Sequence, residues 1–149
     1  MSRESILARF NAGWATESPP ETEAAGDALA SVLPPDTVLA LHGDLGAGKT
    51  TFVRGLARAW DETGPVISPT FNYFLIYRGC RQLIHLDAYR LTRPQDYDSL
   101  LINEFLESPW CLAIEWPENL GDRLPENAWH LFFAAPTETR RVLTLRLTA

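Results

Sequence analysis

One eight-residue stretch has the residue types and spacing of a phosphate-binding loop. The pattern G-x-x-x-x-G-K-S/T is matched without a gap by Gly43-Asp44-Leu45-Gly46-Ala47-Gly48-Lys49-Thr50. Glycines let the backbone point successive N–H groups at phosphate oxygens, and a helix starting at Lys49 would add its unpaired N–H groups and positive dipole end. Lys49 would supply charge to the β- and γ-phosphates, and the Thr50 hydroxyl would ligate Mg²⁺. The stretch therefore predicts a site for ATP with Mg²⁺.

Two carboxylates follow strand-like segments and are candidates for the acidic part of this site. Asp87 ends the apolar run that starts at Leu83, and Glu115 ends the run that starts at Cys111. In open α/β sheets such strand tips line the ligand crevice. Asp87 is predicted to reach Mg²⁺ directly or through water, as a Walker-B aspartate does. Glu115 would complete the Mg²⁺ shell or orient the attacking water, and both roles stay open. With Lys49, these two residues form the predicted catalytic set.

Three nearby features have both a functional and a structural interpretation. Hydroxyls of Ser68 and Thr70 would contact the γ-phosphate or metal as a switch loop does, although Ser and Pro are also common in turns. Trp116 is either a packed wall or a stacking surface, and we favour packing. His85 shares a strand face with Asp87. Without further ligands, a hydrogen-bonded structural histidine is a better interpretation of His85 than a metal ligand.

A strand and a helix must flank the glycine loop to position it. Thr37–His42 is a continuous, mostly apolar run, typical of a strand covered on both faces. After the loop, apolar residues recur at helical spacing from Phe52 to Trp60. Upstream, Ser18 is expected to cap a helix that ends before Pro34, with the Glu21 side chain reaching back to the Ser18 N–H. The loop is thus predicted to lie between a buried strand and a helix.

The remaining strand-like segments predict a mixed sheet. Phe71–Tyr77 and Gln82–Leu86 are separated by only four residues, which forces an antiparallel hairpin. Trp110–Ile114 reads as a further buried strand. Trp129–Phe133 and Arg141–Leu147 are expected to close the chain as a second hairpin.

A further helix is expected over Pro94–Leu106. Its inward side would carry Tyr97, Leu100, Leu101 and Phe105. Together the elements predict an α/β fold, a single-domain P-loop NTPase over residues 1–149, in which helices flank a mixed sheet with antiparallel hairpins. Residues 1–17 are treated as a loosely ordered N-terminal segment.

Composition and charge exclude several classes of function. The chain of 149 residues is 46% hydrophobic and 21% charged, as in soluble globular proteins. It has no apolar run near the roughly 20 residues that span a bilayer and no secretory signal, so we expect a cytoplasmic protein. A net charge of −6 argues against autonomous nucleic-acid binding, so a role with RNA would run through a protein partner. Cys80 and Cys111 form no metal or redox motif, and we expect two unpaired thiols, with Cys111 in a strand.

Four blocks of the sequence resemble the TsaE (YjeE) family in order and spacing. They are Gly43–Thr51, Ser68–Phe71, His85–Leu91 and Ile114–Pro117. The glycine loop is generic to many NTPases, whereas the His-x-Asp-x-Tyr-Arg and Glu-Trp-Pro blocks are far more specific. The resemblance runs from about residue 22 to the C-terminus.

The resemblance implies a small bacterial ATPase that works with the TsaB–TsaD complex in forming threonylcarbamoyladenosine in tRNA, with ATP and Mg²⁺ as cofactors. It implies that Lys49 binds phosphate. An arginine near the C-terminal hairpin, which falls on Arg140 beside Arg141, is implied as a nucleotide contact. The implied metal ligands are Thr50, Asp87 and Glu115. The implied nucleotide-binding residues are Gly43, Asp44, Leu45, Gly46, Ala47, Gly48, Lys49, Thr50, Thr51 and Arg140.

Two other functions are compatible with the loop. A small-molecule kinase would need an acceptor pocket and lid arginines, for which Arg90, Arg93, Arg140 and Arg141 are the candidates. A nucleotide-dependent binding module would use Ser68–Thr70 to report occupancy without catalysis. The absence of a guanine-reading Asn-Lys-x-Asp motif favours ATP over GTP. Oligomeric state and adenine contacts are left open.

Overall fold

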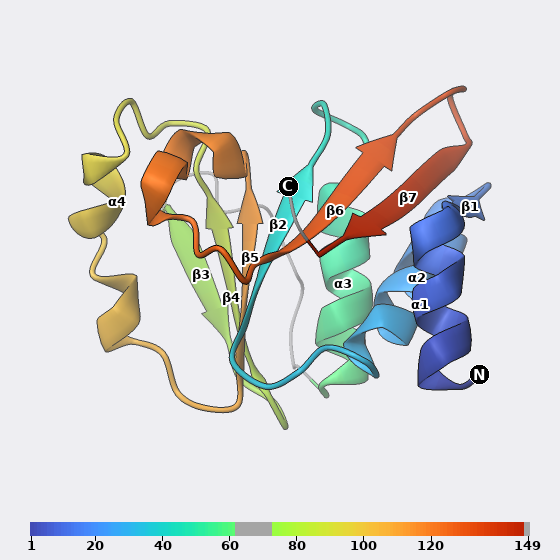
Figure 1. Cartoon of the computed structure of the whole chain (residues 1–149), viewed down its shortest axis with the longest axis horizontal. Coiled ribbons are helices and arrows are strands. Elements are labelled where there is room, and N and C mark those ends of the chain that lie inside the picture. The colour runs from blue at the N-terminus through green and yellow to red at the C-terminus, as the bar shows by residue number, and fades with distance from the viewer. Residues whose placement is uncertain (62–72, 148–149) are drawn as a thin grey trace.

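The strands form one mixed sheet with the order β1-β7-β6-β2-β5-β4-β3 (Figure 1). The structure is a computed structural model that describes residues 1–61 and 73–147. Its strands are β1 (Trp14–Thr16), β2 (Thr37–His42), β3 (Phe74–Tyr77), β4 (Gln82–Asp87), β5 (Trp110–Glu115), β6 (Trp129–Ala134) and β7 (Arg141–Arg146). The central strands β4, β5, β2 and β6 are mutually parallel, whereas β3, β7 and β1 pair antiparallel toward the two edges. The predicted α/β fold with a mixed sheet and two antiparallel hairpins is confirmed.

Helices cover both faces of this sheet. The elements are α1 (Arg3–Ala12), α2 (Pro19–Ala30), α3 (Lys49–Ala59), α4 (Gln95–Asp98) and the 3₁₀ segments η1 (Ile102–Glu104) and η2 (Pro117–Arg123). One core joins α1, α2 and α3 to strand residues such as Leu39 and Leu131. A second core joins Ile84 and Leu112 to Leu120 from η2 on the opposite face. Figure 1 shows α1 and α4 at opposite ends of the sheet.

Helices α2 and α3 pack backbone against backbone at two glycines. A Cβ atom on Gly26 would lie 2.3 Å from the carbonyl oxygen of Phe52, and one on Gly55 would lie 2.0 Å from the carbonyl oxygen of Glu23. Neither position has room for a side chain, because such atoms would overlap the neighbouring backbone. These glycines therefore set how closely α3 lies on α2, and with it the position of the loop that precedes α3.

The N-terminal segment, expected to be loosely ordered, instead forms α1 and β1. Ile6 and Phe10 are buried, and the Phe10 ring centroid lies 4.6 Å from that of Trp14. Strand β1 then pairs with β7 at the edge of the sheet. These few apolar side chains hold the segment in place, because they complete the core beside α2. The segment is short, and its sequence alone did not indicate this packing.

The predicted cap of α2 is correct at one of its two bonds. The Ser18 hydroxyl accepts a hydrogen bond from the Glu21 N–H at 3.4 Å, as expected. The Glu21 carboxylate, however, accepts from the Glu17 N–H at 3.0 Å and does not bond to the N–H of Ser18. The carboxylate thereby ties the end of β1 to the start of α2.

The helix predicted over Pro94–Leu106 is wrong in length. It is broken into α4 and η1, because Leu101 adopts the left-handed region with φ at 55° and ends the helical path. The break shifts the buried face to Ile102, so that Leu101 is 54% exposed and Phe105 43% exposed. Tyr97 and Leu100 do pack against the second core, as predicted.

The cysteines, strand β3 and the lengths of the helices bear on further predictions from the sequence. Cys80 and Cys111 are both unpaired, and burial within β5 raises the pKa of the Cys111 thiol to about 12. Of the strand predicted over Phe71–Tyr77, the part from Phe74 onward is β3, and residues 71–72 lie outside the described residues. Among the helices that the structure describes, none is long and apolar enough to cross a membrane.

Candidate functional site: a phosphate loop facing two strand-tip carboxylates

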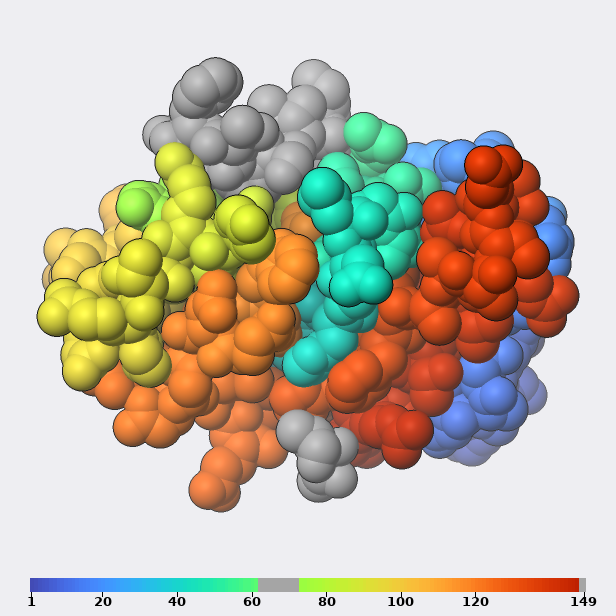
Figure 2. Space-filling model, turned by 90° about the horizontal axis from the view of Figure 1, so that it is seen from above, coloured from blue at the N-terminus to red at the C-terminus, as the bar shows by residue number. Residues whose placement is uncertain are grey.

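The glycine loop lies between β2 and α3, as predicted. Strand β2 ends at His42 and α3 begins at Lys49. Gly46 and Gly48 have φ values of 81° and 104°, in the left-handed region that favours glycine. Gly48 caps α3 without any side-chain hydrogen bond, so the first N–H groups of the helix are left for an anion. Figure 2 looks down on this edge and shows the loop (cyan) between the segment after β5 (orange) and the β6–β7 hairpin (red).

Lys49 is a buried cation held by three neighbours. Its side chain is 4% exposed, and its Nζ donates to the Gly43 carbonyl oxygen at 2.6 Å. Nζ also lies 3.9 Å from Glu115 Oε1 and 4.5 Å from the centroid of the Trp116 ring. A buried ammonium is stable only when it has polar or charged partners, and here the Gly43 carbonyl, the Glu115 carboxylate and the aromatic face supply them. Trp116 thus packs beneath the lysine.

The two predicted strand-tip carboxylates lie on neighbouring strands at the same edge of the sheet. Asp87 and Glu115 are register partners in the parallel pair of β4 and β5, and Glu115 is also the partner of Leu41 in β2. Asp87 Oδ1 accepts a hydrogen bond from the Tyr89 N–H at 3.0 Å, which keeps this carboxylate at the edge of the sheet. Glu115 is 7% exposed.

One cavity of about 280 Å³ joins the loop to these carboxylates. It is lined by Leu45, Gly46, Gly48, Lys49, Thr50, Thr51, Asp87, Glu115 and Trp116. The predicted metal and catalytic residues therefore share one space with most of the predicted nucleotide-binding residues; Gly43, Asp44, Ala47 and Arg140 do not line it. Ser68 and Thr70, the predicted switch residues, lie outside the described residues.

The donor atoms in this cavity fit Mg²⁺ bound together with a phosphate. Within the described ranges, no cluster of three or more His, Cys, Asp or Glu side chains could hold a metal ion by itself. Mg²⁺ does not need one, because it keeps several waters and binds through one or two carboxylates plus substrate phosphates. Thr50, Asp87 and Glu115 present hydroxyl and carboxylate oxygens, the hard ligands that Mg²⁺ prefers.

His85 contacts Glu115 across the two strands, a relationship that the sequence reasoning missed. Its Nε2 lies 2.6 Å from Glu115 Oε2, and the ring is fully buried. The prediction of a hydrogen-bonded histidine is correct, and its partner is a site carboxylate. Alternation along the strand predicted that His85 and Asp87 share a face, but the partner of His85 follows only from the register between β4 and β5.

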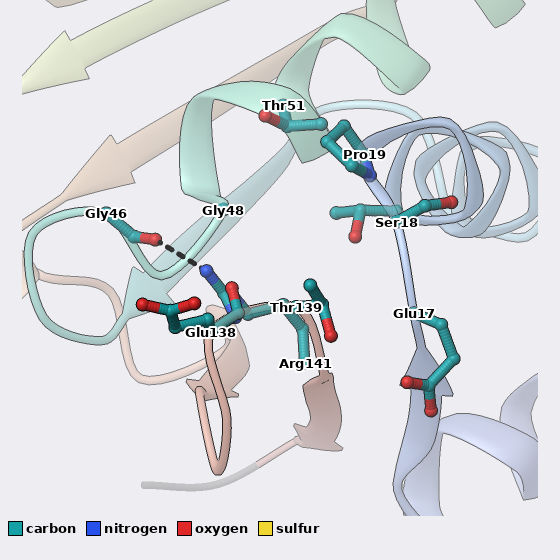
Figure 3. A pocket seen from close by; sticks show the side chains of 10 residues that line it. Glu17, Ser18, Pro19, Gly46, Gly48, Thr51, Glu138, Thr139 and Arg141 are labelled. Atoms are coloured by element: carbon teal, nitrogen blue, oxygen red, sulfur yellow. Dashed lines mark hydrogen bonds between the residues drawn. The ribbon is translucent and has the colours of Figure 1, made fainter.

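A second cavity of about 410 Å³ opens on the other side of the loop (Figure 3). It is lined by Glu17, Ser18, Pro19, Thr22, Gly46, Gly48, Thr51, Glu138, Thr139 and Arg141. Arg141 donates to the Gly46 carbonyl oxygen at 3.3 Å, so it holds the β6–β7 hairpin against the loop. Arg140, the arginine favoured from sequence, is not brought to the loop and instead pairs with Glu17 at 3.2 Å.

A histidine pair lies directly behind the loop. His42 Nε2 is 2.8 Å from His130 Nδ1, and the His42 ring stacks on Phe132 with centroids 4.3 Å apart. Burial lowers the pKa of both histidines, and the charge of His130 lowers that of His42 further. Glu118 acts in the opposite direction on the pKa of His42, and Lys49 adds to the lowering. The pair is therefore neutral over a wider pH range than a free histidine.

Comparison with known proteins agrees with the blocks found in the sequence. A family model described as "Threonylcarbamoyl adenosine biosynthesis protein TsaE" matches residues 16–143. The chain is 33% identical over 132 residues to the tRNA threonylcarbamoyladenosine biosynthesis protein TsaE of Bacillus subtilis (strain 168), which covers 88% of this chain and 82% of the relative. It is 35% identical over 144 residues to the protein of the same name from Mycobacterium tuberculosis (strain ATCC 25618 / H37Rv), with 85% of each covered.

A solved structure agrees with the fold as well. The crystal structure of YdiB from Bacillus subtilis matches with a TM-score of 0.71 and 31% identity, over 91% of this chain and 84% of that one. Sequence and structure thus point to the same group over most of the chain. The chain belongs to the TsaE family of threonylcarbamoyl adenosine biosynthesis proteins.

Proposed function

We propose that this protein is a Mg²⁺-dependent ATP hydrolase that serves the formation of threonylcarbamoyladenosine in tRNA. One observation carries the proposal: the glycine loop, the buried Lys49 and the carboxylates of Asp87 and Glu115 line one cavity. This arrangement offers N–H groups and a cation to phosphate oxygens, and hard oxygen ligands to a metal ion. The family supplies the pathway, since the relatives are named for threonylcarbamoyladenosine biosynthesis.

We place the triphosphate in the smaller cavity and the nucleoside in the larger one. The two cavities share Gly46, Gly48 and Thr51, so a ligand that passes over the start of α3 reaches both. At the start of α3, between the two cavities, the first N–H groups of the helix would bind the phosphates. The ribose and base would then lie between Ser18 and Arg141, the latter in place of Arg140 as the arginine nearest the nucleotide. The preference for adenine over guanine stays a prediction from sequence.

The side chains of the site have different roles in hydrolysis. Lys49 leaves Glu115 and binds phosphate oxygens, because a phosphate carries more negative charge than the carboxylate 3.9 Å away. Thr50 and Asp87 would hold Mg²⁺, which would supply positive charge to the phosphates. Glu115 then orients the attacking water and accepts its proton as the bond to the γ-phosphate breaks.

The partner in this account is a TsaB–TsaD type protein complex, as the family resemblance implies. The chain carries a net charge of −6, which disfavours direct binding to tRNA and favours contact through proteins. Work on tRNA modification would take place in the cytoplasm, as the sequence also predicts.

The experiment is an ATP hydrolysis assay with Mg²⁺, performed on the full chain with and without the candidate partner complex. We expect slow hydrolysis by the chain alone and a clear change in rate when the partner is added. A fixed basal rate and no partner binding would contradict the role in that complex. A phosphorylated small molecule found in place of free phosphate would point to a kinase instead.

A further inference from the structure

His85 is buried beneath the cavity, on the face of the sheet that packs against α3. It lies in β4 two residues before Asp87, and its register partner in β5 is Ala113, two residues before Glu115. The side chains of His85 and Glu115 therefore point to the same face. They meet at 2.6 Å between Nε2 and Oε2, with the histidine fully buried.

We assign the hydrogen in this contact to the histidine. An ionised carboxylate can only accept, so Nε2 carries the hydrogen and donates it to Glu115. Among the residues that the structure describes, Nδ1 of His85 has no hydrogen-bond partner, although it is buried. The bond to Glu115 is thus the hydrogen bond that this buried ring makes. Burying a polar ring with one nitrogen unpaired is unfavourable, so a role for His85 at the site would account for its presence.

The two oxygens of Glu115 have different neighbours. Oε2 is held by His85, and Oε1 lies 3.9 Å from Nζ of Lys49, which lines the smaller cavity. When Lys49 turns to a phosphate, Oε1 loses that neighbour, whereas the bond from His85 can persist. A carboxylate held at one oxygen presents the other in a fixed direction, and such placement matters strongly in catalysis.

We propose that His85 is a positioning residue, which fixes Glu115 so that its Oε1 faces the γ-phosphate side of the cavity. It acts through Glu115 and touches neither nucleotide nor metal ion. This inference rests on the proposed ATP hydrolysis, because it assigns how the hydrolytic carboxylate is held.

The kinetic test compares two substitutions at this position. His85→Gln keeps an N–H donor at a similar reach, whereas His85→Leu has similar bulk and no donor. We expect His85→Leu to lower kcat roughly 10- to 100-fold, as loss of a supporting hydrogen bond does, with the Kd for Mg-ATP within about twofold of the wild-type value. His85→Gln should restore kcat to within a few-fold of wild type. A merely structural histidine would instead give equal losses in both variants, in step with their loss of folded protein.

A second measurement does not depend on activity. In the full chain without nucleotide, ¹⁵N NMR of the histidine rings should show that His85 carries its hydrogen on Nε2. The signals of this ring are assigned by their absence from the spectrum of His85→Gln. They should shift in Glu115→Gln, because the partner of Nε2 is changed. A hydrogen found only on Nδ1 would overturn the proposal, even for a fully active enzyme. So would wild-type kcat in His85→Leu.

Failure of the proposed function has a different signature. If the wild-type chain does not hydrolyse ATP with or without partners, that function is contradicted and the positioning role falls with it. If wild type hydrolyses ATP and the two His85 variants are indistinguishable from it, only the positioning role is contradicted.

Discussion

Lys49 Nζ lies 3.9 Å from Glu115 Oε1, at the point where the start of α3 meets the tip of β5. The pair joins the glycine loop to the sheet edge, where one buried cation and one buried anion lie side by side. Because each residue comes from a separate predicted element, their contact depends on how α3 packs on the sheet.

Lys49→Ala is expected to weaken ATP binding without unfolding the domain. Losing a hydrogen bond to a charged phosphate should cost about 2 kcal/mol, or roughly 30-fold in Kd. Glu115 keeps its bond from His85, so the carboxylate is not left without a partner. Calorimetric titration with Mg-ATP measures the loss, and circular dichroism serves as the control. Global unfolding would mean that the lysine is structural.

Asp87→Asn should separate metal binding from nucleotide binding. The amide keeps the shape but removes the charge that Mg²⁺ requires, so we expect hydrolysis to fall roughly 100-fold. ATP binding measured in the presence of a chelator should be close to wild type, since Asp87 lies across the cavity from the loop. Equal loss of affinity with and without Mg²⁺ would contradict the assignment of Asp87 as a metal ligand.

Arg141 and Arg140 form a matched pair for testing the second cavity. Arg141 lines the cavity and donates to Gly46, whereas Arg140 is bound to Glu17 at the surface. We expect Arg141→Ala to raise the Kd for ATP roughly 5- to 10-fold, about the value of one ordinary hydrogen bond. Arg140→Ala should stay within about twofold, because exposed ion pairs contribute little. The reverse order would restore the prediction made from sequence.

Gly55→Ala is expected to destabilise the fold at the contact between α2 and α3. An added methyl group would lie 2.0 Å from the Glu23 carbonyl oxygen, so the helices must separate. Such overpacking costs typically 1–3 kcal/mol, more than the roughly 1 kcal/mol that alanine gains over glycine in a helix. Arg58→Ala, at an exposed position of the same helix, is the control and should change the free energy of unfolding by less than about 0.5 kcal/mol. Urea denaturation measures both.

Stability should fall as the pH drops below the ordinary histidine value of 6.5. Burial lowers the pKa of His42 and His130 in the folded chain, so the unfolded chain takes up protons first as the pH falls. The contribution of the two histidines to the free energy of unfolding is therefore constant above about pH 6.5 and declines as the pH falls below that value. The double variant His42→Gln/His130→Gln should flatten this decline. An unchanged pH profile in that variant would exclude the pair as its source.

The acidic limb of the same profile has another source. Hydrogen bonds from Thr92 and Arg93 lower the pKa of Asp96 to about 2, so this group loses its charge only at much lower pH. Its effect therefore does not overlap the histidine window.

The loop and the two strand-tip carboxylates were predictable, because each depends on local sequence. Thr37–His42 is strand β2 with the predicted bounds, and both Asp87 and Glu115 end their strands. The central part of the fold follows from the same alternation of apolar runs and turns.

The remaining features depend on contacts between distant segments. The bond from His85 to Glu115 needs the register of β4 against β5, which alternation along one strand does not contain. The break at Leu101 has no proline or glycine to indicate it. Choosing Arg141 over Arg140 requires knowing which of two adjacent side chains faces the loop.

The most direct test of the central claim compares wild type with Glu115→Gln in binding and single-turnover hydrolysis of Mg-ATP. We propose that the loop binds the phosphates and that the Glu115 carboxylate serves the chemical step. Glu115→Gln should therefore bind Mg-ATP with nearly wild-type affinity and hydrolyse it at least about 100-fold more slowly. Wild-type hydrolysis by this variant, or no binding of ATP by the wild-type chain, would contradict it.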